Sequence, residues 1–396
     1  MTPDALRQPG AVLLDAPRPD ADTGRRGALL FQRPVRQIVA RTHAEVPAAL
    51  DALDVALADG LHVAGLVSYE AGEALAPYPF PERPSSVPLV WFGAYDGVIE
   101  VDSAGVKAAL PDSAVRVANP AFALAPEAYR AAVAAVRRRI RAGDVYQINL
   151  TAPISFHLDG DPLALYAALR RRQSVAYGAF LRLPGVSVAS VSPELFFRVD
   201  PEGEGRIITA RPMKGTAPRA ASARDDDALA DALRASPKDR AENLMIVDLL
   251  RNDLARVSET GSVRVPALFQ AERYETVTQM TSTVTATLRP ETGLADAFRA
   301  LFPCGSVTGA PKLRAMQIIR ELESAPRGVY CGAIGHAAPD GTAAFNVAIR
   351  TAVVTDDGAG RYDVGSGIVW DSDPDAEYAE CLLKAQVLTG SAPPEP

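Results

Sequence analysis

The order of the helices and strands that the sequence predicts is the feature that most limits how this chain can fold. Apolar residues recur at helical spacing over 127–141. Between residues 145 and 151 they alternate instead, so that Ile148 and Leu150 point to one face and Gln147 to the other. Such segments follow one another without a strict βαβ alternation. This order favours an α+β fold with largely antiparallel sheets.

The same patterns place the remaining elements along the chain. We expect further helices over 44–59, 162–172, 238–257, 312–322 and 374–389, and strands over 61–69, 89–99, 178–183, 187–199, 328–337, 343–354 and 361–370. Residues 1–28 look irregular, and residues 216–236 are predicted to form a loop with a short helix. Prolines between 102 and 126 indicate a boundary, which divides the chain into an N-terminal region (1–115) and a larger domain (122–390).

Composition excludes several classes of protein. Of the 396 residues, 48% are hydrophobic and 22% charged, as is typical of a soluble globular protein. No apolar run approaches the roughly 18 residues that span a membrane, and the first residues do not resemble a secretory signal. Three widely spaced cysteines favour a reducing, cytoplasmic location. A net charge of −7 and 6% aromatic residues give no reason to expect nucleic acid as a partner.

Two side chains are candidates for catalysis. Lys214 lies between Pro212 and Gly215, in a segment that is stiff at one end and bends at the other. A lysine fixed in this way is a nucleophile if its neighbours lower its pKa, although a solvated loop lysine is the more ordinary interpretation. Glu194 is flanked by apolar residues, and burial would raise its pKa and suit it to general acid catalysis.

Acidic residues on two predicted helices suggest a metal site. Glu242 belongs to a helix that is rich in both charged and apolar residues, while Glu377 and Glu380 share one face of the last helix. Two carboxylates from separate helices, with waters and an anionic substrate, are typical of Mg²⁺. Ion pairs within the helix and the macrodipole preference for acidic residues at a helix start are alternative explanations.

Three further segments are candidates for binding an anion. Residues 305–312 resemble an anion-binding loop that opens a helix, although the positions of the lysine and the hydroxyl residues exclude a Walker P-loop. Backbone N–H groups near Gly367 could face a carboxylate. Arg350, in the strand-like segment 345–354, is the best candidate for a bidentate contact with a substrate carboxylate, although pairing with a carboxylate of the protein is the commoner role.

Taken together, ordered segments over 127–390 resemble the chorismate-utilising enzyme family, and most closely its aminodeoxychorismate synthase component I members. The segments are 143–150, 192–194, 211–216, 239–254, 305–312, 330–335, 348–351 and 365–369, followed by Glu380. The resemblance implies the fold of anthranilate synthase component I, an αββα-type sandwich of mostly antiparallel sheets flanked by helices. Residues 1–110 match only loosely.

The resemblance also implies roles for individual residues. Lys214 would attack C2 of chorismate, and Glu194 would protonate the departing C4 hydroxyl. Glu242 and Glu380 would hold Mg²⁺ against the ring carboxylate, with Glu377 nearby. The substrate-binding residues would be Gln147, Thr308, Gly309, Tyr330, Arg350 and Gly367.

Three positions refine this expectation. Gln147 stands where the water-adding members carry a lysine base, which disfavours addition of water. Lys214 stands where anthranilate synthases usually have alanine, which favours 4-amino-4-deoxychorismate as the product. Gln279 stands where many relatives have histidine, and no catalytic role is assigned to it.

Two alternatives stay open: anthranilate synthase component I, and a non-catalytic relative that binds chorismate or a glutaminase. No segment resembles a glutaminase, so ammonia is expected from a separate glutamine amidotransferase subunit or from solution. Whether the product serves folate (para-aminobenzoate) biosynthesis or secondary metabolism is not decided by the sequence.

Overall fold

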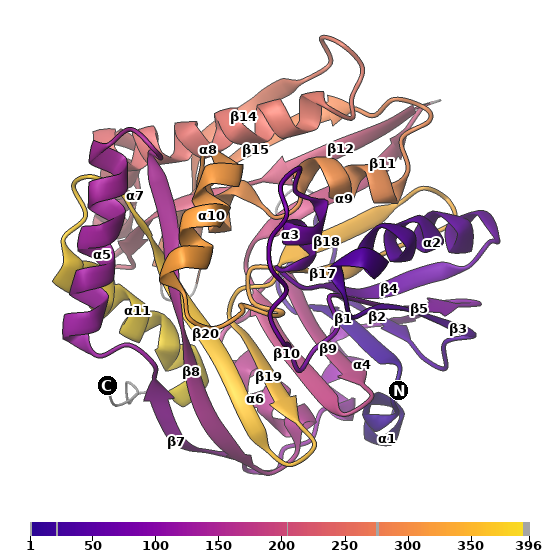
Figure 1. Ribbon diagram of the computed structural model, residues 1–396. Helices are drawn as coiled ribbons and strands as arrows, with labels where there is room; N and C mark the ends of the chain where they lie inside the picture. The colour runs from indigo at the N-terminus through magenta and orange to yellow at the C-terminus, as the bar shows by residue number, and fades with distance from the viewer. Residues whose placement is uncertain (1, 21–22, 204, 275–276, 391–396) are drawn as a thin grey trace.

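The strands form two large sheets in a computed structural model that describes residues 2–20, 23–203, 205–274 and 277–390 (Figure 1). Each sheet has ten antiparallel strands within these residues. The first contains, in spatial order, β16 (Gly309–Ala310), β8 (Gln147–Asp159), β20 (Ala359–Ile368), β19 (Thr351–Thr355), β10 (Val186–Ser192), β9 (Tyr177–Leu183), β1 (Ala11–Ala16), β2 (Gly27–Phe31) and β6 (Ile99–Val101), with β7 (Arg116–Phe122) beside β8. The second contains β13 (Met213–Pro218), β15 (Val277–Thr287), β12 (Gly205–Arg211), β11 (Leu195–Glu202), β18 (Ala343–Val347), β17 (Ala333–Ala337), β4 (His62–Val67), β5 (Val90–Tyr95) and β3 (Arg36–Ala40), with β14 (Arg264–Arg273) beside β15.

Helices cover the outer faces of both sheets. They are α1 (Pro3–Arg7), α2 (Val46–Ala58), α3 (Ala71–Leu75), α4 (Ser103–Ala109), α5 (Pro126–Arg141), α6 (Pro162–Arg172), α7 (Ala223–Ala235), α8 (Pro237–Ala255), α9 (Leu294–Leu301), α10 (Lys312–Leu322) and α11 (Pro374–Thr389), with the short 3₁₀ segments η1 (His43–Glu45) and η2 (Gly305–Val307). In Figure 1, α5 and α11 lie on one side of the molecule and α2 and α9 on the other. Among the described residues, no helix combines the length and the apolar character needed to cross a membrane.

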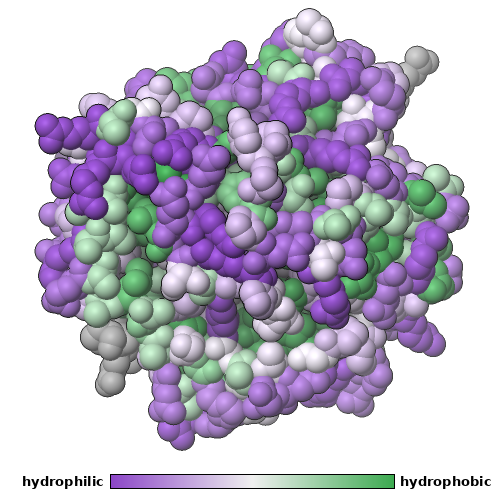
Figure 2. Space-filling model, viewed as in Figure 1, coloured by the Kyte–Doolittle hydropathy of each residue, from purple (hydrophilic) through white to green (hydrophobic). Residues whose placement is uncertain are grey.

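Three buried clusters hold these layers together. Between the sheets, Val12 and Leu181 of the first pack with Leu66, Trp91 and Ile334 of the second. A second cluster joins the first sheet to α5, α6, α10 and α11, and a third joins the second sheet to α2, α8 and α9. On the face seen in Figure 2, hydrophilic residues cover most of the outer surface, and hydrophobic residues lie in small groups between them. The predicted α+β class and its αββα layering are confirmed.

The N-terminal region contributes strands to both sheets. β1 pairs with β9, and β4 pairs with β17. The predicted irregularity of residues 1–28 was therefore wrong. Both faces of β1 are largely covered, so its residues lack the alternation that marks a half-exposed strand. Asp15 in this strand is buried and accepts a hydrogen bond from Tyr166 (2.9 Å).

Two segments that look like single strands in the sequence are each two strands. Residues 187–199 divide at Pro193 into β10 and β11, which belong to different sheets. Residues 343–354 divide in the same way into β18 and β19. The predicted loop at 216–236 is also corrected, because β13 ends at Pro218 and α7 occupies Ala223–Ala235. Ser222 caps α7 by accepting a hydrogen bond from the N–H of Asp225 (3.1 Å).

Candidate active site

Most of the residues that the sequence singles out line one cavity of about 280 Å³. It is bounded by β13, the end of β20, the N-terminal half of α8 and the helix α11. The segments that connect β10 to β11 and β18 to β19 close it on another side. The predicted residues in its lining are Glu194, Lys214, Glu242, Tyr330, Arg350, Gly367, Glu377 and Glu380.

Glu194 lies where the chain leaves the first sheet for the second. Its carbonyl accepts a hydrogen bond from the N–H of Val347 (3.0 Å). Two residues further on, Phe196 and Phe197 pack against Phe298, with ring centroids 6.4 and 5.5 Å away. Aromatic contacts of this kind contribute about 1 kcal/mol each beyond the area they bury. The backbone that carries Glu194 is therefore rigid.

The surroundings of Glu194 favour its protonated form. The residue is 4% exposed, and burial raises its pKa from 4.5 to about 7. A hydrogen bond from Ser306 Oγ to Oε1 (2.7 Å), the charge of Lys214 and the N–H of Met213 act in the opposite direction but are outweighed. A carboxyl group with this pKa is partly protonated at neutral pH and can act as a general acid.

Lys214 is held on β13, and its amine faces the same cavity. The next residue, Gly215, has φ +90°, and a Cβ there would lie 3.0 Å from the carboxylate of Asp239. Burial lowers the pKa of Lys214, and the charge of Lys384 acts in the same direction. The nearby carboxylates, of which Glu242 has the largest effect, oppose this shift without cancelling it. The neutral amine is therefore more populated than in a solvated lysine.

The side chains of Lys214 and Gln147 both pack against the backbone of Gly367. A Cβ at Gly367 would lie 2.5 Å from Gln147 Nε2 and 2.6 Å from Lys214 Nζ, so any larger residue would displace both side chains. Gln147 is fully buried directly behind the cavity wall. Neither Oε1 nor Nε2 of Gln147 has a hydrogen-bond partner among the described residues. Buried amide groups are normally satisfied, so these two atoms are an exception in the protein interior next to the cavity.

The three predicted metal-binding glutamates come from two helices. Glu242 lies on α8, and Glu377 and Glu380 lie on α11. Burial raises the pKa of Glu242, despite the opposing charge of Lys214. Burial also tends to raise the pKa of Glu380, but Lys384, whose Nζ lies 2.7 Å from Glu380 Oε1, outweighs it and the net shift is downward.

These carboxylates fit Mg²⁺ as an open site. In the described parts of the chain, no three acidic, histidine or cysteine side chains form a ready-made metal cage. Glu242 and Glu380 nevertheless present oxygen atoms to one cavity from two separate helices. Mg²⁺ usually takes only one or two carboxylates from the protein and completes its shell with waters and substrate oxygens. The donor set agrees with that chemistry.

Arg350 lies at the crossing between β18 and β19, not within a single strand as the sequence suggested. It has φ +52°, an uncommon conformation for a residue with a side chain. Burial lowers the pKa of its guanidinium group. Its side chain forms no ion pair with any other described residue, which leaves its donors available to an anion in the cavity.

The predicted substrate contacts Thr308 and Gly309 do not line the cavity. The hydroxyl of Thr308 donates to the carbonyl of Cys304 (3.1 Å), within its own loop. Gly309 pairs with β8, and a Cβ there would lie 2.2 Å from the carbonyl oxygen of Gln147. Lys312 donates to Asp253 Oδ2 (2.6 Å). The loop therefore packs against β8 and α8, and it contributes Ser306 and Val307 to the cavity lining.

The sequence model of the chorismate binding enzymes matches residues 18–390. The chain belongs to this family. It is 45% identical over 277 residues to an aminodeoxychorismate synthase of Streptomyces pristinaespiralis, covering 70% of this chain and 38% of that protein. It is 41% identical over 268 residues to an anthranilate synthase component 1 of Methanothermobacter marburgensis, covering 68% of this chain and 57% of that protein. The chain thus spans between about a third and somewhat over half the length of these relatives.

A solved structure supports the same placement. The anthranilate synthase component I of Streptococcus pneumoniae superposes with a TM-score of 0.78 at 28% identity, covering 93% of each chain. This chorismate binding enzyme is therefore similar both to aminodeoxychorismate synthases and to anthranilate synthases.

Among the polar residues to which sequence reasoning assigned no role, three stand out in the candidate site. Ser306, Lys238 and Lys384 all line the cavity. Lys384 stands four residues after Glu380, a spacing that predicts an ion pair on one helix and could have drawn attention to it. The contact between Ser306 and Glu194 joins residues 112 positions apart, and no local pattern indicates it.

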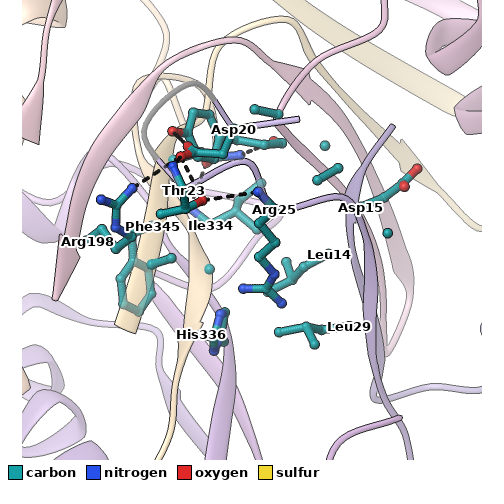
Figure 3. A pocket seen from close by; sticks show the side chains of 18 residues that line it. Leu14, Asp15, Asp20, Thr23, Arg25, Leu29, Arg198, Ile334, His336 and Phe345 are labelled. Carbon is teal, nitrogen blue, oxygen red and sulfur yellow. Dashed lines mark hydrogen bonds and ion pairs between the residues drawn. The ribbon is translucent and has the colours of Figure 1, made fainter. Parts of the chain in front are cut away.

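A second, smaller cavity of about 80 Å³ lies between the sheets of this chorismate binding enzyme (Figure 3). Figure 3 shows the side chain of Arg25 extending between Leu14 and His336, and Arg198 and Thr23 in contact with Asp20. Burial and the charge of Arg25 lower the pKa of His336 to about 3. This histidine is neutral at physiological pH, and none of the predicted catalytic residues reaches the cavity.

Proposed function

We propose that this chain aminates chorismate to 4-amino-4-deoxychorismate, the reaction of aminodeoxychorismate synthase component I. The observation that carries the proposal is the placement of Lys214 and Glu194 in one cavity with pKa values shifted toward each other. Burial lowers the pKa of the lysine and raises that of the glutamate. A neutral amine beside a protonated carboxyl supplies both a nucleophile and an acid at neutral pH.

The proposed reaction has two displacements. The neutral amine of Lys214 attacks C2 of chorismate, the double bond shifts, and the C4 hydroxyl leaves as water with the proton of Glu194. Ammonia then attacks C4, the double bond shifts back, and the C2–N bond to Lys214 breaks. Lys214 leaves as its neutral amine, and the new ammonium group at C4 returns a proton to Glu194. Two allylic shifts return the new amine to C4, whereas direct attack by ammonia would place it at C2.

Charged groups around the cavity would hold the two carboxylates of chorismate. Glu242 and Glu380, with Glu377 nearby, would hold Mg²⁺, which when bound neutralises the ring carboxylate. Arg350 would bind the other carboxylate through its guanidinium group. Gln147, behind Gly367, would donate or accept one hydrogen bond at the reacting face, because its amide is otherwise unsatisfied.

We also propose that ammonia comes from a separate glutamine amidotransferase. A glutaminase of that class needs an accessible thiolate nucleophile. Cys304, Cys331 and Cys381 are buried, and burial raises the pKa of each thiol. None of the three suits that role.

Anthranilate synthase component I is the second candidate. It is favoured by the 41% identity to an anthranilate synthase component 1 of Methanothermobacter marburgensis. It shares the acid, the metal ligands and the arginine, so Lys214 is the residue on which the choice rests.

The deciding experiment incubates the purified chain with chorismate, Mg²⁺ and ¹⁵N-ammonium. We expect 4-amino-4-deoxychorismate, which keeps the ring and the side chain of chorismate and carries the ¹⁵N label at C4. Mass spectrometry and NMR identify it. Without ammonium, the Lys214 peptide should gain the mass of the dehydrated substrate. Lys214→Ala should lose this product, and any residual amination should occur at C2. Anthranilate from the unaltered chain, or 4-amino-4-deoxychorismate from Lys214→Ala at the unaltered rate, would overturn the proposal.

A further inference from the structure

Arg327 forms a fully buried ion pair next to the candidate active site. Its side chain is 1% exposed, and that of its partner Glu323 is 7% exposed. Nε donates to Glu323 Oε2 (2.9 Å), and Nη2 donates to Oε1 (2.7 Å). Removing two charges from water is unfavourable, and such pairs often contribute little to net stability. A role beyond stability is therefore worth seeking in what else the pair contacts.

The remaining donors of Arg327 bind backbone carbonyls from two other elements. Nη1 donates to Val307 O (2.8 Å), in the loop that contains η2, and Nη2 donates to Asn149 O (2.7 Å), on β8. The N–H of Thr151, also on β8, donates to Glu323 Oε1 (3.0 Å). The ion pair thus joins the 305–308 loop to β8 and to the end of α10.

A second carboxylate fixes the backbone of the arginine itself. Glu70 accepts hydrogen bonds from the N–H groups of Arg327 (2.6 Å) and Gly328 (3.0 Å). The guanidinium carbon also lies 4.5 Å from the centre of the Tyr69 ring. These contacts leave the guanidinium group with one orientation, which a flexible surface arginine would not have.

Both carbonyls that Arg327 binds belong to residues of the active-site wall. Asn149 and Val307 line the cavity, while Arg327 itself does not. Ser306, the residue before Val307, donates the hydrogen bond to Glu194. We propose that Arg327 is a positioning residue, which holds the 305–308 loop so that Ser306 is aimed at the acid Glu194. This inference rests on the proposed function only because it takes Glu194 as the acid. It applies equally if ammonia is added at C2, since that reaction uses the same acid.

The consequence for the reaction is a change in the ionisation of Glu194. The Ser306 hydrogen bond lowers the pKa of Glu194, against the larger effect of burial. If the loop moves, Glu194 loses this contact, and its pKa rises above about 7. The acid must be protonated, so kcat/KM falls as pH rises through this pKa. Loosening the loop should therefore move the falling limb of the profile to higher pH.

The experiment is a double-mutant cycle with Arg327→Lys and Ser306→Ala. Lysine keeps the charge but cannot bind Glu323 and two carbonyls at once. We expect each single variant to lower kcat about fivefold, as the loss of one hydrogen bond would, and to move the falling limb to higher pH. Because Arg327 would act through Ser306, the double variant should be no worse than Ser306→Ala alone. Additive losses, or an Arg327→Lys variant whose limb does not move, would overturn the proposal.

Arg170→Lys is the matched control, because Arg170 forms a comparably buried pair with Asp15 (2.5 Å) that contacts no residue of the cavity lining. It should lower thermal stability without moving the pH limb. Circular dichroism shows whether Arg327→Lys folds. If it does not, Glu323→Gln takes its place and should move the falling limb of the pH profile to higher pH. A falling limb that does not move refutes the positioning role of Arg327. If the unaltered chain forms no aminated product, the proposed function is contradicted. The results that would overturn the role of Arg327 are different, because they are measured only when the unaltered chain is active.

Discussion

Replacing Glu194 with glutamine should make the protein more stable at alkaline pH while removing its activity. Glutamine has nearly the same shape, still accepts the hydrogen bond from Ser306, and carries no charge. The unaltered carboxyl is buried, and its pKa is raised from 4.5 to about 7. At pH 8 the folded protein must therefore hold an ionised carboxylate in surroundings that disfavour it.

The magnitude follows from linkage between protonation and folding. Raising a pKa from 4.5 to about 7 corresponds to about 3 kcal/mol. Below pH 4.5 the group is protonated in both the folded and the unfolded chain, and the full stability is present. As pH rises toward 7 only the unfolded chain loses the proton, so the stability contribution is lost through that range. The advantage of Glu194→Gln should therefore be small at pH 5 and approach 3 kcal/mol at pH 8.

Urea unfolding at pH 5, 6, 7 and 8, followed by tryptophan fluorescence, measures this difference. Glu202→Gln, at an exposed position of β11, controls for the loss of one negative charge. Chorismate consumption by Glu194→Gln should fall at least a hundredfold, because the amide cannot protonate the leaving hydroxyl. An advantage that is equal at pH 5 and pH 8 would refute the assignment of Glu194 as a buried acid, whatever the activity.

Three further predictions concern charge and ammonia. Glu242→Gln and Glu380→Gln should abolish turnover with little change in the urea midpoint; activity of either variant, or of the unaltered chain in excess EDTA, would exclude both as Mg²⁺ ligands. Arg350→Lys should raise the KM for chorismate about tenfold or more, because a bidentate contact to a carboxylate is lost; an unchanged KM would remove Arg350 from the binding site. Glutamine alone should give no product until a class I glutamine amidotransferase from the same source is added, and glutamine-dependent activity of the isolated chain would contradict this.

The sequence predicts best those elements whose pattern is local. The helices α6, α10 and α11 lie where helical spacing places them, and β8 begins within its predicted alternation. β1 escaped prediction because both of its faces are largely covered, which removes the alternation. Strand-forming residues also continue on both sides of Pro193, where the chain changes sheets. Nothing in a hydrophobic pattern distinguishes one long strand from two short strands in different sheets.

The candidate site shows the same division between local and distant information. Lys214 and Glu194 are recognisable from their neighbours in the sequence, and the structure places both in one cavity. Thr308, predicted to bind substrate, does not line the cavity, because its hydroxyl donates to the carbonyl of Cys304 in the folded loop. Ser306 was missed because its partner is distant in the sequence. Side-chain direction within a loop is set by tertiary contacts, which the sequence does not display.

The topology explains why a buried glutamate and a buried arginine meet here. β10 pairs with β19 in the first sheet, and β11 pairs with β18 in the second. The two segments that cross between the sheets therefore lie side by side. The N–H of Val347 donates to Glu194 O (3.0 Å), and the N–H of Val191 donates to Arg350 O (3.1 Å). The segment that joins β10 to β11 is therefore bonded by β18, and the segment that joins β18 to β19 is bonded by β10.

Residues at such a crossing belong to neither strand ladder, so their side chains need not alternate between the two faces of a sheet. They can point into the space where the sheets separate. Arg350 achieves this with a positive φ, a strained conformation that the flanking strands impose. Glu194 achieves it after a proline, which cannot continue the ladder of β10. The paired crossings thus hold Glu194 and Arg350 on bonded backbone in the lining of one cavity. The helices α8 and α11 contribute carboxylates to the lining of the same cavity, and β13 contributes Lys214.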